Sequence, residues 1–262
     1  AGYTDITILE KSDGVGGTWR DNLYPGCACD VPVALYQFSF APTPKWSHLY
    51  ARGPEIREYA NDLCDWFQLH PHLKLNEEPI KAVWNDAKSS WTLTTRAGAT
   101  YEADVVISAL GQLNRPQWPN IPGRDSFKGA SMHSARWDQS VSLKGKRVLC
   151  IGSAASAVQL IPEVAKEAAH LSVFQRTPNW CIPRLDQAIT DEDKVLMMTN
   201  PEVAMKLGAM TRELIYERAD HFFWQAFQWT PEGRAALTRQ ALDHLHAQVP
   251  DDIRLIVIGA VE

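Results

Sequence analysis

Short runs of apolar residues alternate with segments of helical periodicity along this chain. The apolar runs predict strands at residues 5–9, 101–109, 146–151 and 170–174. A Pro-rich connector at residues 115–123 separates the first two strands from the second two. Strands that alternate with helices are typical of α/β folds. The pattern therefore predicts two similar α/β units.

Further elements follow from the same pattern. A helix is expected to begin at Pro54, because proline suits the first turn of a helix. Its apolar face recurs at helical spacing through Ile56, Tyr59, Ala60, Leu63 and Phe67. Residues 81–85 and 91–95 predict a β-hairpin, and residues 190–249 are expected to be mostly helical. Residues 18–53 show no periodicity, and a structured loop of this length is usually functional.

The composition argues against several classes of protein. With 262 residues, 45% of them hydrophobic, the chain can form one large or two ordinary domains. A net charge of −5 argues against nucleic acid as a partner, and no apolar run is long enough to span a bilayer. The five cysteines include no Cys-x-x-Cys pair, and no Cys/His cluster completes a metal site. We therefore expect reduced thiols in a cytoplasmic protein without a bound metal.

A glycine turn follows the third predicted strand. The segment Gly152-Ser-Ala-Ala-Ser-Ala157 matches most of the Gly-x-Gly-x-x-Gly/Ala pattern that binds dinucleotides, with Ala154 in place of the second glycine. The helix that follows offers free amide groups to a phosphate, and Ser153 and Ser156 add hydroxyl groups. Pro162 is expected to bend or interrupt that helix, because it removes one backbone hydrogen bond.

The fourth strand ends at Gln175-Arg176-Thr177, which indicates the cofactor. NAD-specific sites carry an acid at this position, whereas NADP-specific sites carry a cation for the 2′-phosphate. Arg176 offers a planar guanidinium to a phosphate, and Thr177 adds a hydroxyl group. We therefore expect NADPH to bind here, with a binding set of Gly152, Ser153, Ala154, Ser156, Gln159, Arg176 and Thr177.

The first unit has a similar strand end. Glu10 follows the strand at residues 5–9, where an acid would accept hydrogen bonds from a ribose. The glycine turn that precedes such an acid by about 20 residues would lie before Ala1. We therefore expect this chain to be an internal piece of a longer protein.

A stretch between the two units carries a family signature. Phe127, Gly129, His133, Trp137 and Asp138 form the pattern F-x-G-x-x-x-H-x-x-x-W-D. This pattern resembles the fingerprint of Baeyer–Villiger monooxygenases, flavoproteins that use NADPH and O2. In that family the fingerprint connects the two domains. The resemblance implies that His133 couples movement of the NADP domain to the flavin, and the alternative is a role as catalytic base.

A second stretch carries the same resemblance. Gly16-Gly17-Thr18-Trp19, followed by Tyr24-Pro-Gly26 and by Asp30, resembles the segment of the family that contacts FAD. Two adjacent glycines let the backbone approach a flat ligand closely. The resemblance implies that Asp30 faces the flavin and the nicotinamide. The implied FAD set is Glu10, Gly16, Gly17, Thr18, Trp19 and Asp30.

The resemblance also implies a fold and its domains. The expected fold is α/β, with two Rossmann-like dinucleotide-binding domains for FAD and NADP, both incomplete or truncated, and a helical insertion in the second. We place a partial FAD-binding domain at residues 1–125 and the fingerprint linker at 126–144. The NADP-binding domain is placed at 145–262, with the insertion at about 190–249.

The implied activity uses FAD, NADPH and O2 to insert one oxygen atom beside a ketone carbonyl, which gives an ester or lactone. Oxidation of sulfides is a second implied activity. Two alternatives stay open: a flavin N- or S-monooxygenase, and a non-catalytic nucleotide-binding fragment. Gly259-Ala260 is followed by Val261-Glu262 where the family carries Lys-Arg, so no residue takes the role of the family's catalytic Arg. We therefore expect the chain by itself to be inactive.

Overall fold

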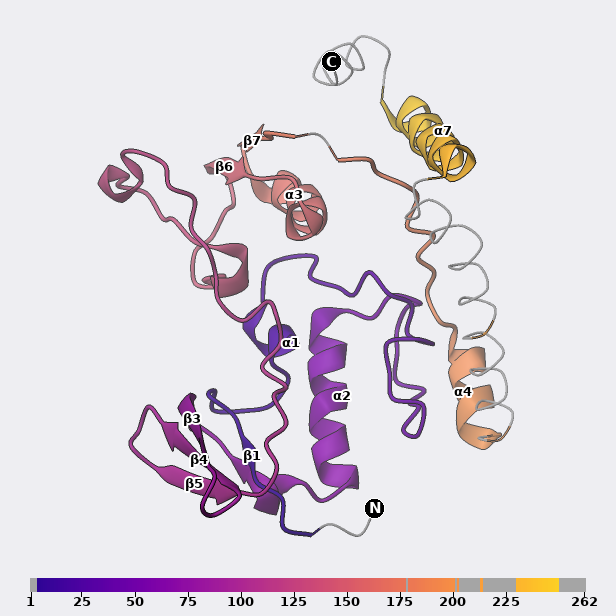
Figure 1. Ribbon diagram of the computed structural model, residues 1–262. Helices are drawn as coiled ribbons and strands as arrows, with labels where there is room; N and C mark the ends of the chain where they lie inside the picture. Colours follow the sequence, from indigo (N-terminus) through magenta and orange to yellow (C-terminus); the bar gives the residue numbers. More distant parts are fainter. Residues whose placement is uncertain (1–3, 178, 201, 203–212, 214–229, 250–262) are drawn as a thin grey trace. The chain divides into compact units, whose positions relative to one another are not determined.

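The computed structural model describes residues 4–177, 179–200, 202, 213 and 230–249 (Figure 1). The chain forms two compact units. The first comprises Ala1–Tyr24 and Gly53–Ser140, and the second comprises Pro25–Arg52 and Val141–Glu262. The loop segment 25–52 thus belongs to the same unit as the second glycine turn, although it lies far from that turn in the sequence.

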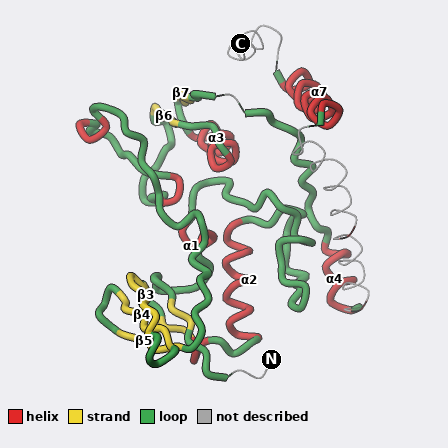
Figure 2. The backbone as a smooth tube through the Cα atoms, in the orientation of Figure 1, coloured by secondary structure: helices red, strands yellow, loops and turns green. Residues whose placement is uncertain are grey.

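The first unit begins with two short parallel strands. Strand β1 (Ile8–Leu9) pairs with β2 (Leu73–Lys74), with Ile8 beside Leu73. The strand predicted at residues 5–9 is therefore present at its end only, and β2 was not expected from the sequence. The predicted loop at 18–53 opens with a four-residue helix, α1 (Thr18–Asp21). Most of the remainder is loop, as Figure 2 shows.

The predicted helix after residue 53 is confirmed as α2 (Gly53–Trp66). Of the expected apolar face, Ile56 and Tyr59 are buried, and Ala60 and Leu63 are half-buried. Phe67 was wrongly placed on that face. The helix ends at Trp66; the Phe67 amide still donates to the Leu63 carbonyl oxygen at 3.1 Å, but the Phe67 side chain is 48% exposed. A single turn, η1 (His70–His72), then leads into β2.

A three-stranded antiparallel sheet completes the regular structure of the first unit. It contains β3 (Pro79–Asn85), β4 (Ser90–Thr95) and β5 (Thr100–Ala103) in that order. The predicted hairpin is therefore confirmed, and Trp84 lies opposite Trp91 with ring centroids 5.4 Å apart.

The strand predicted at residues 101–109 ends early. Strand β5 stops at Ala103, and the apolar residues that follow lie outside any strand, with Val105 75% and Ile107 84% exposed. A buried strand needs neighbours on both sides, and none of the described strands pairs with residues 104–109. The prediction of a buried strand here was wrong for this chain. Two further single turns, η2 (Arg124–Ser126) and η3 (Ser134–Arg136), follow in the connector.

The second unit contains the predicted strand–turn–helix–strand sequence. Strands β6 (Arg147–Ile151) and β7 (His170–Phe174) are parallel and are joined through α3 (Ala155–Glu167), which confirms both strand predictions. Pro162 lies inside α3 and does not interrupt it, so of the two expected effects, a bend or an interruption, the interruption does not occur. The helix tolerates the lost hydrogen bond because Leu160 and Val164, on either side of Pro162, are buried.

Two further helices lie in the described part of residues 190–249. They are α4 (Asp191–Thr199), which begins with a capping box at Thr190 and Asp193, and α7 (Pro231–Gln248), which begins at the Thr230 cap. These ranges confirm the expected helical character, and the rest of the predicted insertion lies outside the described residues. Within the part of the chain that the structure describes, no helix is long and apolar enough to cross a membrane.

Candidate dinucleotide site

The second glycine turn lies at the carboxyl edge of the β6–β7 pair. Ile151 and Phe174 are register partners and are the last residues of their strands. Gly152 follows with φ +110°, a conformation that side-chain-bearing residues rarely adopt, and its amide donates to the Phe174 carbonyl oxygen at 2.8 Å. The turn is therefore fixed to the end of the neighbouring strand, where doubly wound folds bind nucleotides.

Helix α3 presents its amino-terminal end next to this turn. Ala154 is the N-cap, and no side chain caps the helix. The first amide groups of such a helix are left available to a phosphate. Ser153 and Ser156, both half-buried, lie before and within the first turn of α3. The predicted phosphate-binding elements are thus brought together at one helix end.

Asn179 also contacts this turn, although it was not among the predicted site residues. Its side-chain amide nitrogen donates to the Ser153 carbonyl oxygen and lies 3.2 Å from the Ser153 Oγ. Asn179 therefore holds the glycine turn from the segment that follows β7. Only a tertiary contact could reveal this role, because 26 residues separate the two partners.

Arg176 and Thr177 follow the end of β7 after one intervening residue, Gln175, and both are exposed. Because β6 and β7 end in register, Arg176 and Gly152 leave the sheet at the same edge. A dinucleotide whose pyrophosphate lies on the glycine turn would present its adenosine ribose near the end of β7. The geometry thus suits Arg176 to a phosphate on that ribose.

Gln159 differs from the rest of the predicted NADP set. Its Oε1 accepts from the Ala28 amide at 3.2 Å, and its Nε2 donates to the Ala28 carbonyl oxygen at 2.8 Å. Its side chain is therefore engaged by the backbone of residue 28. Asp30 lies two residues further along the same segment and is exposed.

The predicted FAD residues of the first unit lie at β1 and α1. Glu10 follows β1 as expected, and its Oε1 accepts from the Ser12 amide at 2.7 Å. Gly16 and Gly17 have φ of +112° and +48°, so both positions favour glycine, and Gly17 is the N-cap of α1. Thr18 and Trp19 are the first two residues of α1. The glycine pair thus serves as the turn into a short helix.

The fingerprint residues form a local network in the first unit. The Nδ1 of His133 accepts from the Ala135 amide at 3.0 Å and so caps η3, which leaves Nε2 to carry the proton of the neutral ring. The imidazole ring packs edge-on against the Trp118 ring, and the two ring centroids are 5.7 Å apart. Arg136 forms an ion pair of 3.3 Å with Asp21 of α1. The fingerprint is therefore tied to the helix that follows the glycine pair.

The remaining fingerprint residues are partly exposed. Phe127 is exposed, and its ring lies over Gly129, where a Cβ would come within 2.6 Å of it unless the ring moved aside. Trp137 is half-buried. Asp138 accepts from the Ser140 hydroxyl at 2.6 Å and from its amide at 2.9 Å, and these two hydrogen bonds lower the pKa of the Asp138 carboxyl.

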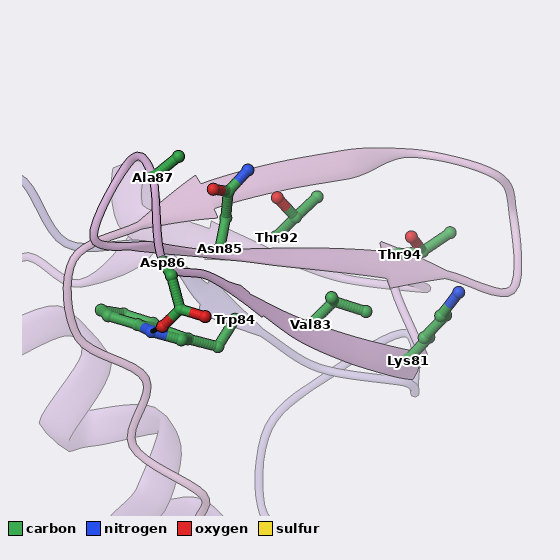
Figure 3. A pocket seen from close by; sticks show the side chains of 8 residues that line it. All are labelled: Lys81, Val83, Trp84, Asn85, Asp86, Ala87, Thr92 and Thr94. Carbon is green, nitrogen blue, oxygen red and sulfur yellow. Dashed lines mark hydrogen bonds between the residues drawn. The ribbon is translucent and has the colours of Figure 1, made fainter.

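One surface depression has a lining of its own. It is formed on the β3–β4 hairpin of the first unit (Figure 3), where Trp84 Nε1 donates to Asp86 at 3.0 Å. None of the predicted site residues lines it. Its lining consists of Lys81, Val83, Trp84, Asn85, Asp86, Ala87, Thr92 and Thr94. Among the described residues, no group of three or more His, Cys, Asp and Glu side chains is placed to hold a metal ion.

The predicted site residues divide between the two units. Glu10, the glycine pair with Thr18 and Trp19, and the fingerprint belong to the first unit, whereas Asp30 and the whole NADP set belong to the second. The segment after Pro250, where the family's catalytic Arg was sought, lies outside the described residues.

Comparison with known proteins identifies relatives of this chain. Residues 32–198 match the family model described as pyridine nucleotide-disulphide oxidoreductase. A Baeyer–Villiger monooxygenase of Streptomyces coelicolor is 46% identical over 76% of this chain and 38% of its own length. Another, from Pseudomonas aeruginosa, is 38% identical over 95% of this chain and 46% of its own length. The chain therefore spans less than half of these relatives.

A solved structure agrees with the sequence matches. The crystal structure of OTEMO in complex with FAD and NADP superposes with a TM-score of 0.67 at 35% identity. The match covers 75% of this chain and 39% of the OTEMO chain. The similarity to Baeyer–Villiger monooxygenases predicted from the sequence is thus confirmed, and so is the α/β fold class.

Proposed function

Because the chain belongs to the pyridine nucleotide-disulphide oxidoreductase family and is similar to Baeyer–Villiger monooxygenases, we propose that its protein is an FAD- and NADPH-dependent monooxygenase. It inserts one oxygen atom of O2 beside a ketone carbonyl to give an ester or lactone, and sulfides are a second class of substrate. The enzyme works in the cytoplasm. FAD and NADPH supply the electron transfer and the oxygen chemistry when they are bound.

The observation that carries this proposal is the carboxyl edge of β6 and β7. Gly152 with φ +110°, the uncapped amino terminus of α3 and the exposed Arg176 converge there. Amide groups and a helix dipole suit a pyrophosphate, and a guanidinium suits the extra phosphate that distinguishes NADP from NAD. These residues fit NADPH, with Ser153, Ala154, Ser156 and Thr177 completing the site.

The first unit fits part of an FAD site. Glu10 at the end of β1 would accept a ribose hydroxyl, and the backbone at Gly16 and Gly17 would lie close to the cofactor, next to Thr18 and Trp19. We therefore propose two Rossmann-like units, with FAD in the first and NADP in the second. The limits proposed from the sequence, 1–125, 126–144 and 145–262, remain predictions.

The chain's own residues have distinct roles in this proposal. Asp30 offers an exposed carboxylate to the flavin and nicotinamide, and the fingerprint residues around His133 couple the two cofactor sites. The Nδ1 lone pair of His133 accepts a hydrogen bond from the Ala135 amide. That bond favours a positioning role over a role as catalytic base, although Nε2 is left for a further contact.

Two measurements test the proposed function. Calorimetric titration of the 262-residue chain should show binding of NADP⁺ that is tighter than that of NAD⁺, with little FAD bound. The full-length protein should carry yellow flavin and convert a cyclic ketone to a lactone only with NADPH and O2. Oxidation of amines or sulfides without any lactone would favour the N- or S-monooxygenase alternative. Absence of any nucleotide binding would contradict the proposal.

A further inference from the structure

The segment that carries Asp30 is fastened to the helix of the second glycine turn. We define residues 25–30 as the Asp30 loop. Gln159, one turn into α3, forms two hydrogen bonds with Ala28, accepting from its amide at 3.2 Å and donating to its carbonyl oxygen at 2.8 Å. The Gln159 amide thus pairs with the loop as a neighbouring strand would. We call this pair of hydrogen bonds the Gln159 clamp.

A glycine lets the loop come this close to the helix. Gly26 has φ +77°, and a Cβ at this position would lie 2.6 Å from the backbone oxygen of Gln159 and 3.0 Å from the Cγ of Glu163. Backbone cannot move aside as a flexible side chain can, so any larger residue would push the loop away from α3. The same stretch of helix therefore contacts the loop at two separate points.

The residues between the clamp and Asp30 are also held. The Cys29 amide donates to the Ala51 carbonyl oxygen at 2.8 Å, and the Cys29 carbonyl oxygen accepts from Arg184 at 2.8 Å. Arg184 itself lies over the ring of Tyr50, 4.8 Å from its centre. Ala28 and Cys29 are 5% and 2% exposed. Four consecutive backbone polar groups before Asp30 are thus paired and buried, which fixes the backbone that leads into Asp30.

We propose that Gln159 is a positioning residue that holds the Asp30 loop on α3, and that it is not a ligand of the nucleotide. Asp30, which the proposed function assigns to the flavin, thus lies on a loop that is held against α3, the helix whose first turn is proposed to bind the pyrophosphate. The importance of Asp30 to catalysis rests on the proposed function, whereas the Gln159 clamp does not.

Amide hydrogen exchange of the 262-residue chain tests the clamp directly. Gln159→Leu keeps the approximate size of the side chain and removes both hydrogen bonds, so exchange at residues 27–31 should become about tenfold faster or more. Gly26→Ala changes the loop side of the same contact, so it should also speed amide exchange at residues 27–31. Glu167→Gln is the control, because Glu167 is an exposed residue at the far end of α3. Unchanged exchange in Gln159→Leu would overturn the proposal.

Nucleotide affinity and catalysis separate positioning from binding. Gln159→Leu should leave the dissociation constant for NADP⁺ within about twofold of the unmodified chain, whereas loss of a nucleotide ligand would weaken binding by roughly tenfold or more. In the full-length enzyme the same change should slow flavin reduction by NADPH without changing NADPH affinity. Loss of NADP⁺ affinity with unchanged loop exchange would make Gln159 a ligand. If no form binds nucleotide, the proposed function fails, and the exchange result still decides the clamp.

Discussion

The Gly152 amide donates a hydrogen bond to the Phe174 carbonyl oxygen at 2.8 Å. This bond joins the glycine turn after β6 to the last residue of β7, so the turn and the segment that begins at Gln175 share one edge. Under the proposed function, a cofactor bound at the turn would therefore lie near Arg176, after the end of the neighbouring strand. Substitutions at the turn and at Arg176 should accordingly affect the binding of the same nucleotide.

Arg176→Ala should weaken NADP⁺ binding to the chain and leave NAD⁺ binding nearly unchanged. A hydrogen bond to a charged group contributes about 1.5–3 kcal/mol, so the loss should be roughly tenfold or more. Calorimetric titration with NADP⁺ and with NAD⁺ measures the loss of affinity for each nucleotide. Arg147→Ala is the matched control, because Arg147 is an exposed arginine at the opposite end of β6. Equal losses for both nucleotides would remove Arg176 from the phosphate site.

Gly152→Ala should destabilise the second unit and weaken NADP⁺ binding. The position has φ +110°, where a residue with a side chain is strained by about 1–3 kcal/mol. A Cβ at this position would meet no atom within 4 Å, so the strain comes from the backbone and not from crowding. Chemical denaturation measures the loss in the free energy of unfolding. Ala154→Gly, at a position with φ −75°, should change stability far less, and equal effects would contradict a backbone origin of the strain.

The variants His133→Ala and His133→Asn should differ in stability. The Nδ1 of His133 caps η3, and loss of such a cap costs about 0.5–2 kcal/mol. Asn can replace the cap, so His133→Asn should recover most of the stability. If the ring itself couples the two cofactor sites, both variants of the full-length enzyme should turn over slowly with normal flavin content. Full activity in His133→Asn would limit His133 to capping.

The hydrogen bonds from Ser140 should be visible in the titration of Asp138. They lower the pKa of the Asp138 carboxyl, the side-chain hydroxyl being the larger cause. Stability from this contact is therefore present above the ordinary carboxyl pKa and is lost as the pH falls through the lowered value. In Ser140→Ala the pKa of Asp138 should rise toward its ordinary value, as followed by NMR. An unchanged pKa would show that the backbone amide alone is responsible.

Cys29 and Cys181 should react at very different rates with a thiol reagent. Burial raises the pKa of the Cys29 thiol, and the side chain is 2% exposed, whereas Cys181 is exposed. The thiolate is the reactive form, so Cys29 should stay unmodified while Cys181 is labelled. Mass spectrometry after brief labelling at neutral pH measures both sites. Fast labelling of Cys29 would mean that the loop around it opens readily.

Several of these features could be foreseen from local sequence alone. The strands β6 and β7, the helix α2 and the β3–β4 hairpin follow from residue periodicity, which is a property of neighbouring residues. The turn at Gly152 and the cation at Arg176 were also predicted from local sequence. Each role follows from the position of the residue just after its own strand, β6 for Gly152 and β7 for Arg176. The family resemblance rested on patterns of this kind.

Other features depended on residues that are distant in the sequence. Gln159 pairs with Ala28, which lies 131 positions away, and no local pattern encodes that pairing. The same holds for Asn179 at Ser153 and for the place of residues 25–52 in the second unit. Residues 104–109 have the composition of a buried strand, yet a strand forms only where another strand offers hydrogen bonds. The sequence by itself determined the local elements and the chemistry of the turn, and the tertiary structure decided which backbone groups meet, because such contacts depend on how the whole chain packs.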